Sequence, residues 1–149
     1  MSAGREVRFQ RANYLVSDLD RALELYRDIL GFEVAFVKDS EDASYSYTVF
    51  EINRDSDMRF AVLSTPEQPR VMALTEIKEP GIDPHPAPKR AAIVLEMPDI
   101  DGVVADCQAK GFNVHEEEVL ETHDGRIGRE VGVNDADGNL VVLYYIPAK

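Results

Sequence analysis

Two segments of the chain carry apolar residues at helical spacing between an aspartate and a glycine. The first segment begins at Asp18 and ends at Gly31, and the second begins at Asp99 and ends at Gly111. An aspartate carboxylate caps the first turn of a helix, and glycine readily adopts the left-handed conformation that ends one. The pattern therefore predicts one helix in each segment. It also places Cys107 on the apolar side of the second helix, as a buried thiol rather than a nucleophile.

Runs of β-forming residues, separated by turn residues, flank both predicted helices. A short apolar stretch before each capping aspartate predicts a first strand, and the remaining runs predict the other strands. Each half of the chain then has the order β-α-β-β-β, and the first half has one additional strand at 45–52. The predicted strands after the first ones span residues 32–38, 45–52, 58–64, 71–77, 112–120, 128–133 and 140–146.

The two halves are an internal repeat. Aligning Asp18 with Asp99 places D-L-D on D-I-D at an offset of 81 residues, and G-F-E-V matches G-F-N-V in the same order at an offset of 80. A proline-rich segment without apolar periodicity separates the halves and is interpreted as a linker. The organisation predicted is a single α+β domain over 1–149, with module 1 at 5–78, a linker at 79–90 and module 2 at 91–147. Each small sheet with one helix is expected to leave a concave face unpacked. Two such faces can lie opposite each other, within one chain or across a dimer, and the space between them is then a pocket.

The amino-acid composition limits the classes of partner that are expected for this chain. The 149 residues are 44% hydrophobic and 30% charged, with a formal net charge of −12. A chain this acidic repels nucleic acid and anionic membranes. No apolar stretch is long enough to span a bilayer, the first residues lack the apolar core of a secretory signal, and the single cysteine provides no disulfide or thiolate cluster. The expected location is the cytoplasm.

Three sequence stretches carry a resemblance to a known family: VSDLDRALELYRDILGFEV, PDIDGVVADCQAKGFNV and NDADGNLVVLYY. They resemble the vicinal oxygen chelate superfamily, which includes glyoxalases, bleomycin-resistance proteins and extradiol dioxygenases. The resemblance covers nearly the whole chain. It implies a glyoxalase-like fold of two βαβββ modules, with a cavity between curved mixed sheets. It also implies a homodimer, because members of the family form dimers with exchanged strands or modules.

The resemblance also implies where the family's metal ligands would be. The equivalent positions in this chain are Arg11, Ala73, Ala92 and Val142. None of these side chains ligates a cation, so we expect no metal and no other cofactor. Glu76 is the nearest acidic residue on its strand, but strand alternation directs it to the opposite face from residue 73.

The three histidines are interpreted as surface or loop residues, with a role at the pocket mouth as the alternative. They are His85, His115 and His123, and their spacing matches no familiar metal motif.

Residues that follow the four implied ligand positions at alternate places share their strand faces, so they are predicted to line the pocket. The central strand of module 1 is expected to add Phe60 and Val62, and the strand before the turn at 135–139 is expected to add Glu130 and Gly132. The resulting lining is mostly apolar with a few polar groups, as is typical of small-molecule sites. The predicted ligand-binding residues are Arg11, Asn13, Phe60, Val62, Ala73, Thr75, Ala92, Val94, Glu130, Val142 and Tyr144, with Glu96 and Gly132 also facing inward.

Arg11 is the central candidate, because a guanidinium in a pocket must be paired. It pairs either with Glu130 or Glu96, or with a carboxylate, phenolate or carbonyl group of a ligand. The first functional hypothesis is a metal-free protein that binds a small, largely apolar or aromatic molecule. The alternative is a metal-independent lyase or isomerase in which Arg11 stabilises an enolate or oxyanion and Glu130 or Tyr144 moves the proton. A metal-dependent glyoxalase or dioxygenase is the third hypothesis.

Overall fold

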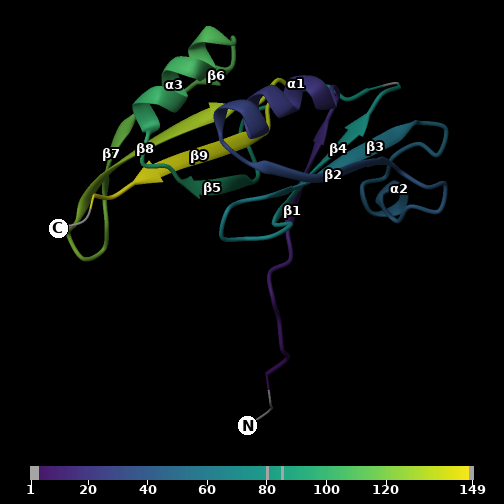
Figure 1. The fold of residues 1–149 in the computed structure, drawn as a ribbon, viewed down its shortest axis with the longest axis horizontal. Helices are drawn as coiled ribbons and strands as arrows, with labels where there is room; N and C mark the ends of the chain where they lie inside the picture. Colours follow the sequence, from purple (N-terminus) through teal and green to yellow (C-terminus); the bar gives the residue numbers. More distant parts are fainter. Residues whose placement is uncertain (1–3, 80, 85, 148–149) are drawn as a thin grey trace.

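The computed structural model describes residues 4–79, 81–84 and 86–147, which form two mixed β-sheets with helices on one side (Figure 1). Sheet A has the strand order β1-β4-β3-β2, and sheet B has the order β5-β9-β8-β6 with β7 also paired to β8. In each sheet the first and last strands of the module are parallel neighbours. The strands are β1 (Ala12–Val16), β2 (Glu33–Asp39), β3 (Met58–Ser64), β4 (Met72–Ile77), β5 (Ala92–Glu96), β6 (Asn113–Val114), β7 (Glu118–Glu121), β8 (Ile127–Asn134) and β9 (Leu140–Tyr145).

The helix of the first module begins where the sequence predicts. The Asp18 carboxylate accepts a 3.1 Å hydrogen bond from the Arg21 N–H at the start of α1 (Leu19–Leu23). After α1 the helix continues in π-helical form as η1 (Glu24–Ile29). Gly31 follows at φ 90°, the left-handed conformation that favours glycine. The predicted helix is therefore confirmed, although its second half is wider than an α-helix.

The helix of the second module repeats this arrangement. The Asp99 carboxylate accepts a 3.0 Å hydrogen bond from the Gly102 N–H at the start of α3 (Ile100–Ala109). Gly111 lies at φ 81° after the helix. Both modules therefore use the same cap and the same glycine, in agreement with the internal repeat. The two mixed sheets, each with its helix, confirm the predicted α+β glyoxalase-like fold.

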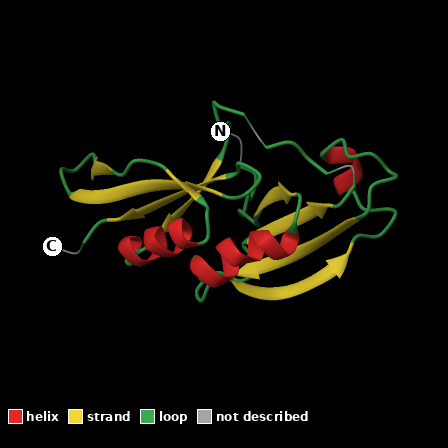
Figure 2. Ribbon diagram, turned by 90° about the horizontal axis from the view of Figure 1, so that it is seen from above, coloured by secondary structure: helices red, strands yellow, loops and turns green. Residues whose placement is uncertain are grey.

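The two sheets lie side by side, with α1 and α3 on the same side of both (Figures 1 and 2). Each sheet thus has a helix-covered face and an opposite face, here called its open face. The line where β1 approaches sheet B is here called the seam. At the seam the Tyr14 phenol donates a 2.7 Å hydrogen bond to the Leu140 carbonyl and accepts one of 2.8 Å from the Ile93 N–H. This hydroxyl therefore connects the edges of the two sheets.

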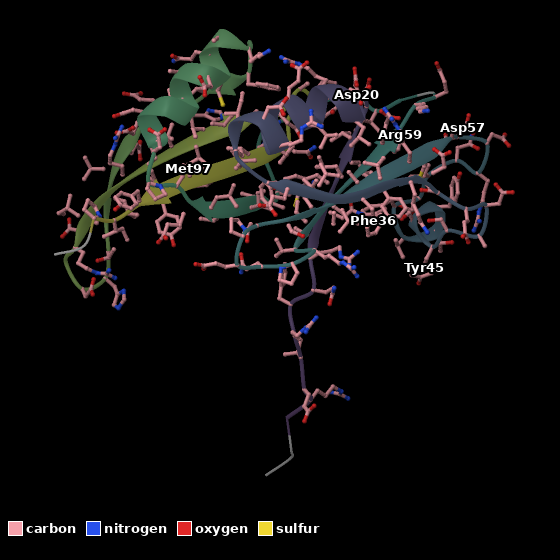
Figure 3. All side chains as sticks on the ribbon, viewed as in Figure 1. Asp20, Phe36, Tyr45, Asp57, Arg59 and Met97 are labelled. Carbon is pink, nitrogen blue, oxygen red and sulfur yellow. The ribbon has the colours of Figure 1, made fainter. Side chains whose placement is uncertain are left out.

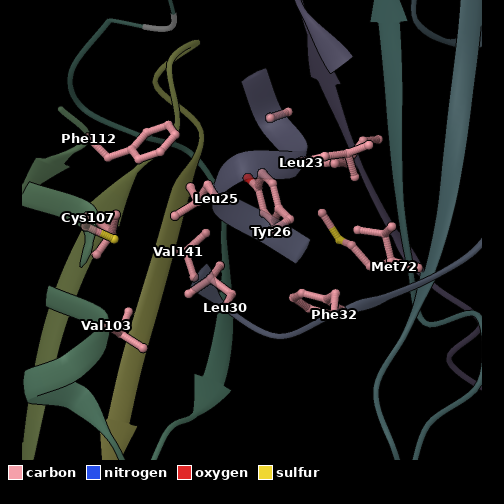
Figure 4. Close-up of a cluster of buried hydrophobic side chains, with 14 of the residues drawn as sticks. Leu23, Leu25, Tyr26, Leu30, Phe32, Met72, Val103, Cys107, Phe112 and Val141 are labelled. Carbon is pink, nitrogen blue, oxygen red and sulfur yellow. The ribbon is translucent and has the colours of Figure 1, made fainter. Parts of the chain in front are cut away.

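One hydrophobic core runs beneath both helices (Figure 4). Leu25 and Tyr26 of η1 are fully buried between Met72 of sheet A and Val141 of sheet B. Cys107 of α3 lies in the same cluster, as the sequence predicts. Because the core is shared, the faces of both sheets that lie beneath α1 and α3 are packed.

The predicted strand at 45–52 is wrong, because this segment contains the short helix α2 (Ser46–Val49). The N–H groups of Val49 and Phe50 donate to the carbonyls four residues earlier, at 3.0 Å each. One helical turn suffices to bury Tyr47, whose phenol donates a 2.7 Å hydrogen bond to the Ser56 carbonyl. Tyr45 and Tyr47 stand two residues apart, as in a strand with one buried and one exposed face. On this helical turn Tyr47 is likewise buried, and Tyr45 is 73% exposed.

The predicted strand at 112–120 is interrupted. It forms β6 and β7, with residues 115–117 between them. The remaining predicted strands agree with observed ones to within a residue at each end. The described part of the predicted linker, 79–90, contains no helix or strand, and His85 lies outside the described residues. No helix among the described residues has the length and apolar character needed to cross a bilayer.

The open faces of the two sheets differ in how they are covered. Next to α2, Tyr47 packs with Met58 and Ile77 in a small buried cluster on the open side of sheet A. Phe36 and Tyr45 lie on this side of the sheet, whereas Arg59 and Asp20 meet on the helix side (Figure 3). Sheet B has no such cover among the described residues, and Val94 on its open face is 60% exposed.

Candidate functional site

The predicted pocket residues of module 1 occupy the open face of sheet A, but much of that face is packed. Asn13, Phe60 and Ala73 alternate with core residues, so they point away from the helices. Ala73 and Thr75 are only 4% and 2% exposed, and the Thr75 hydroxyl donates a 3.0 Å hydrogen bond to Asn13 Oδ1. Val62 is also buried. This half of the predicted lining therefore consists mostly of packed side chains.

The predicted residues of module 2 form two rows across the open face of sheet B. Val94, Val142 and Gly132 are register partners in one row. The other row contains Glu96, Tyr144, Glu130 and Glu118.

A hollow of about 210 Å³ lies on this face. It is lined by Glu116, Glu118, Glu130, Val131, Gly132 and Val142. The open face of sheet B is thus an apolar centre with carboxylates along one side.

A larger crevice follows the seam between the modules. Its volume is about 330 Å³, and both modules contribute to its walls. Ala92 and Val94 are the predicted lining residues that it includes, and Thr65 and Gln68 supply polar side chains. Val94 lies beside Val142 of the sheet B hollow, so the crevice and the hollow adjoin. The crevice is lined by Phe9, Ala12, Phe32, Thr65, Gln68, Val71, Met72, Ala92, Ile93, Val94 and Leu95.

His115 is part of the open face of sheet B, which the sequence does not predict. Its Nε2 lies 2.6 Å from Asn134 Oδ1, and because an amide oxygen only accepts, Nε2 is the donor. A Cβ atom at Gly132 would lie 3.1 Å from the His115 ring, so the glycine leaves the space that the ring uses. A glycine within an alternating strand was the signal available in the sequence.

The three predicted catalytic residues do not come together within one chain. Glu130 and Tyr144 are register partners on sheet B. Arg11 is exposed and lies directly before β1, at the edge of sheet A. Among the residues that the structure describes, Arg11 forms no ion pair with Glu130 or Glu96 of the same chain.

The residues at the implied metal-ligand positions do not fit a metal ion. Ala73 and Val142 face the open sides of their sheets with hydrocarbon side chains, and Ala92 does the same at the seam. Arg11 carries a guanidinium, which does not ligate cations. Within the described ranges, no group of three or more His, Cys, Asp or Glu side chains is placed to hold a metal ion.

Glu76 points to the helix side of sheet A, as alternation predicts. Its carboxylate accepts hydrogen bonds from the Leu19 N–H at 2.6 Å and from Arg59 Nε at 2.8 Å. Burial raises the pKa of Glu76, but these hydrogen bonds outweigh burial and hold the pKa below its usual range. The residue therefore anchors the start of α1 to β4 and takes no part in the open-face site.

The family is established by sequence comparison. Residues 8–143 match the model of the Glyoxalase/Bleomycin resistance protein/Dioxygenase superfamily. The match covers most of the chain, so the protein belongs to this superfamily, as the resemblance of its motifs implies. No protein among the curated sequences matches the chain.

Solved structures support the same fold at low sequence identity. A glyoxalase family protein from Bacillus cereus is 16% identical, with 99% of each chain covered and a TM-score of 0.76. A glyoxalase/bleomycin resistance protein/dioxygenase domain from Frankia sp. EAN1pec is 16% identical, covering 96% of this chain and 100% of that one, with a TM-score of 0.67. An antibiotic-binding protein from Streptomyces sp. CB03234 is 18% identical, covering 97% of this chain and 100% of that one, with a TM-score of 0.61.

Proposed function

We propose that the protein binds a small, largely apolar or aromatic molecule in the seam crevice, without a metal ion. The observation that carries this proposal is that side chains of both modules build one crevice of about 330 Å³. Cavities that bind small molecules begin at about 300 Å³ and are mainly apolar. Thr65 and Gln68 supply the few polar groups that orient a ligand in such a site.

The side chains around the crevice support an apolar ligand. Phe32 and Met72 belong to the buried core at the base of the crevice, whereas Phe9 and Val94 are 76% and 60% exposed at its edge. Burying exposed apolar area of this kind contributes about 25 cal/mol per Å². A flat aromatic molecule that covers Phe9 and Val94 therefore gains affinity without a charged partner.

The proposal that no metal takes part rests on the side chains at the four positions where the family resemblance implies metal ligands. The four implied ligand positions carry one guanidinium and three hydrocarbon side chains. The similarity in fold to an antibiotic-binding protein from Streptomyces agrees with a binding role. The lyase or isomerase alternative has weaker support, because it requires Arg11 beside Glu130 and Tyr144, and the single chain does not supply this arrangement.

A neutral aromatic dye tests the proposal. Titration with 1-aminoanthracene is expected to give a saturable rise in dye fluorescence. Ala92→Phe places a larger side chain at the crevice wall and is expected to weaken dye binding at least tenfold, a change of about 1.4 kcal/mol. The matched control is Ala105→Phe on the exposed side of α3, which is expected to leave binding unchanged. Equal binding by both variants, with unchanged thermal midpoints, would contradict the crevice as the site.

Metal analysis tests the second half of the proposal. Protein purified without chelator is expected to hold less than one tenth of an equivalent of zinc, nickel, iron or manganese. Dialysis against EDTA is expected to leave dye binding unchanged. A stoichiometric amount of any of these metals, or loss of dye binding after dialysis, would contradict the metal-free site.

A further inference from the structure

A basic hollow lies at one end of the seam, where the linker enters β5. Its volume is about 230 Å³, and Lys89 and Arg90 line it together with Asn13 and Tyr14 of β1. Lys89 and Arg90 are the only two basic residues that are adjacent in the sequence. None of the described residues that line the hollow is an aspartate or glutamate, although the chain carries 28 of them and a net charge of −12. Cations gathered in so acidic a chain point to an anionic ligand.

Three side chains supply N–H donors to the basic hollow. Arg90 is exposed, and within the described ranges its guanidinium forms no ion pair with a carboxylate. Asn13 Oδ1 accepts the Thr75 hydroxyl at 3.0 Å, which leaves Asn13 Nδ2 as a donor. Lys89 is half-buried in the same hollow and adds a second positive charge. A guanidinium binds a carboxylate through two parallel hydrogen bonds, so this set of donors fits a carboxylate.

The turn between β8 and β9 also lines the basic hollow, but its two aspartates contact other groups. Asp135 Oδ2 accepts a 2.9 Å hydrogen bond from the Tyr26 phenol, and Asp137 Oδ2 accepts one of 3.0 Å from the Ser17 N–H. Both aspartates are buried. Neither carboxylate therefore takes the place of a ligand beside Arg90.

The basic hollow adjoins the seam crevice. Ala91 lines the hollow, and the next residue, Ala92, lines the crevice. The Tyr14 phenol of the hollow accepts a hydrogen bond from the N–H of Ile93, which lines the crevice. Two residues of extended chain reach about 7 Å at most, so Arg90 begins within that distance of Ala92. A molecule as long as three fused rings can therefore place its rings in the crevice and an attached group in the hollow.

The opposite end of the crevice carries the opposite charge. A hollow of about 160 Å³ at that end shares Thr65 and Leu95 with the crevice and is also lined by Glu96. Within the described parts of the chain, Glu96 forms no ion pair. Its carboxylate would repel an anionic group. The charges at the two ends therefore favour one orientation of an anionic ligand, with the anion toward Arg90.

We propose that the ligand of the seam crevice is an aromatic or otherwise largely apolar molecule that carries a carboxylate, held in the basic hollow by Arg90, Lys89 and Asn13. This ligand class rests on the proposed binding function, to which it adds the charge and the orientation of the ligand. The net charge of the whole chain disfavours an anion. A preference for the anionic form must therefore come from local donors such as these three.

Two fluorescent probes with the same ring system and different charge test the proposal. Anthracene-2-carboxylate is anionic near neutral pH, and anthracene-2-carboxamide is neutral. Wild type is expected to bind the carboxylate at least tenfold more tightly than the amide at low ionic strength. Added salt is expected to reduce this preference, because it screens the charges.

Variants locate the origin of the preference. Arg90→Gln is expected to reduce it to threefold or less. Lys110→Gln removes an exposed cation at the end of α3 and is the control with the same change in net charge, expected to keep the preference. Ala92→Phe fills the crevice and is expected to weaken the binding of both probes at least tenfold.

The two proposals fail in different ways. If the amide binds and the carboxylate binds no more tightly, the carboxylate site is overturned and the crevice remains a binding site. If neither probe binds, both proposals are overturned. A preference that persists in Arg90→Gln, or that Lys110→Gln also loses, overturns the carboxylate site alone. Carboxylate binding that Ala92→Phe leaves unchanged overturns it as well, because the probe would then occupy the hollow without the crevice.

Discussion

The Tyr26 phenol of module 1 donates a 2.9 Å hydrogen bond to Asp135 Oδ2 of module 2. Tyr26 is fully buried in η1, and Asp135 begins the turn between β8 and β9. The same turn reaches back to β1, because Asn139 Nδ2 donates a 2.9 Å hydrogen bond to the Leu15 carbonyl. The Asp-Ala-Asp-Gly-Asn motif, which contributes to the family resemblance, thus joins the two modules.

Tyr26→Phe is expected to lower the free energy of unfolding by about 1–3 kcal/mol, because it leaves a buried carboxylate with one donor fewer. Burial raises the pKa of Asp135, and the donor lost in this variant is one that stabilises the ionised form. Urea denaturation measures the change. Tyr45→Phe removes an exposed hydroxyl and is the control, expected to cost nothing measurable. Equal costs for the two variants would show that the contact between the modules contributes little.

Glu76→Gln tests the contact between α1 and β4 through its pH dependence. Because the pKa of Glu76 is lower in the folded state, its ionised form contributes stability at pH values above its unfolded pKa, and this contribution is lost as the pH falls through the folded-state pKa. The difference in unfolding free energy between wild type and Glu76→Gln is therefore expected to be constant from pH 7 to about 5 and to shrink below about pH 4.

Urea denaturation at several pH values measures this difference. Asp20→Asn is the control, since Asp20 also approaches Arg59, at 3.6 Å, but its side chain is 83% exposed. It is expected to give a small difference at every pH. A difference for Glu76→Gln that stays constant down to pH 3 would rule out the ionised carboxylate as the stabilising species.

Local signals in the sequence predict much of the fold. The Asp18 and Asp99 caps and the glycines after the helices depend on neighbouring residues alone, so their patterns suffice. Alternation likewise predicts which face Ala73 and Glu76 occupy. The helix at Ser46–Val49 is not predicted, because a single turn with one buried tyrosine has the same spacing of apolar residues as a short strand.

The candidate site depends on tertiary contacts and is predicted less completely. The burial of Ala73 and Thr75 and the position of the His115 ring result from segments that are distant in sequence. The crevice itself exists because the edges of the two sheets meet at Tyr14. Alternation along one strand carries no information about which edges meet, so it does not predict Phe32 and Met72 as lining residues.

Cys107 is expected to be unreactive in the folded protein. Burial raises the pKa of its thiol to about 11, so the reactive thiolate is scarce at pH 8. Reaction with Ellman's reagent is expected to be slower in buffer than in 6 M guanidinium chloride by on the order of a hundredfold. Ala105→Cys in a Cys107→Ala background places a thiol on the exposed side of the same helix and is expected to react quickly. Rapid reaction of folded wild type would mean that α3 opens readily.

Gly132→Ala is expected to release the His115 ring from a single tautomer, with little change in the free energy of unfolding. The added methyl would lie 3.1 Å from His115 Cδ2 and 3.3 Å from Leu140 Cδ1, so the ring must shift by a few tenths of an ångström, and we expect this shift to weaken its hydrogen bond to Asn134. Replacing glycine in a strand regains about 0.5–1 kcal/mol, which offsets the cost of the shift.

Long-range ¹H–¹⁵N NMR of the imidazoles is expected to show one fixed tautomer, protonated at Nε2, in wild type at high pH. In Gly132→Ala it is expected to show an average of both tautomers, and Asn134→Ala should give the same average by removing the acceptor. His123, which is exposed, serves as the internal reference. Unchanged His115 signals in both variants would mean that Asn134 does not orient the ring, and His115 would then be an ordinary surface histidine.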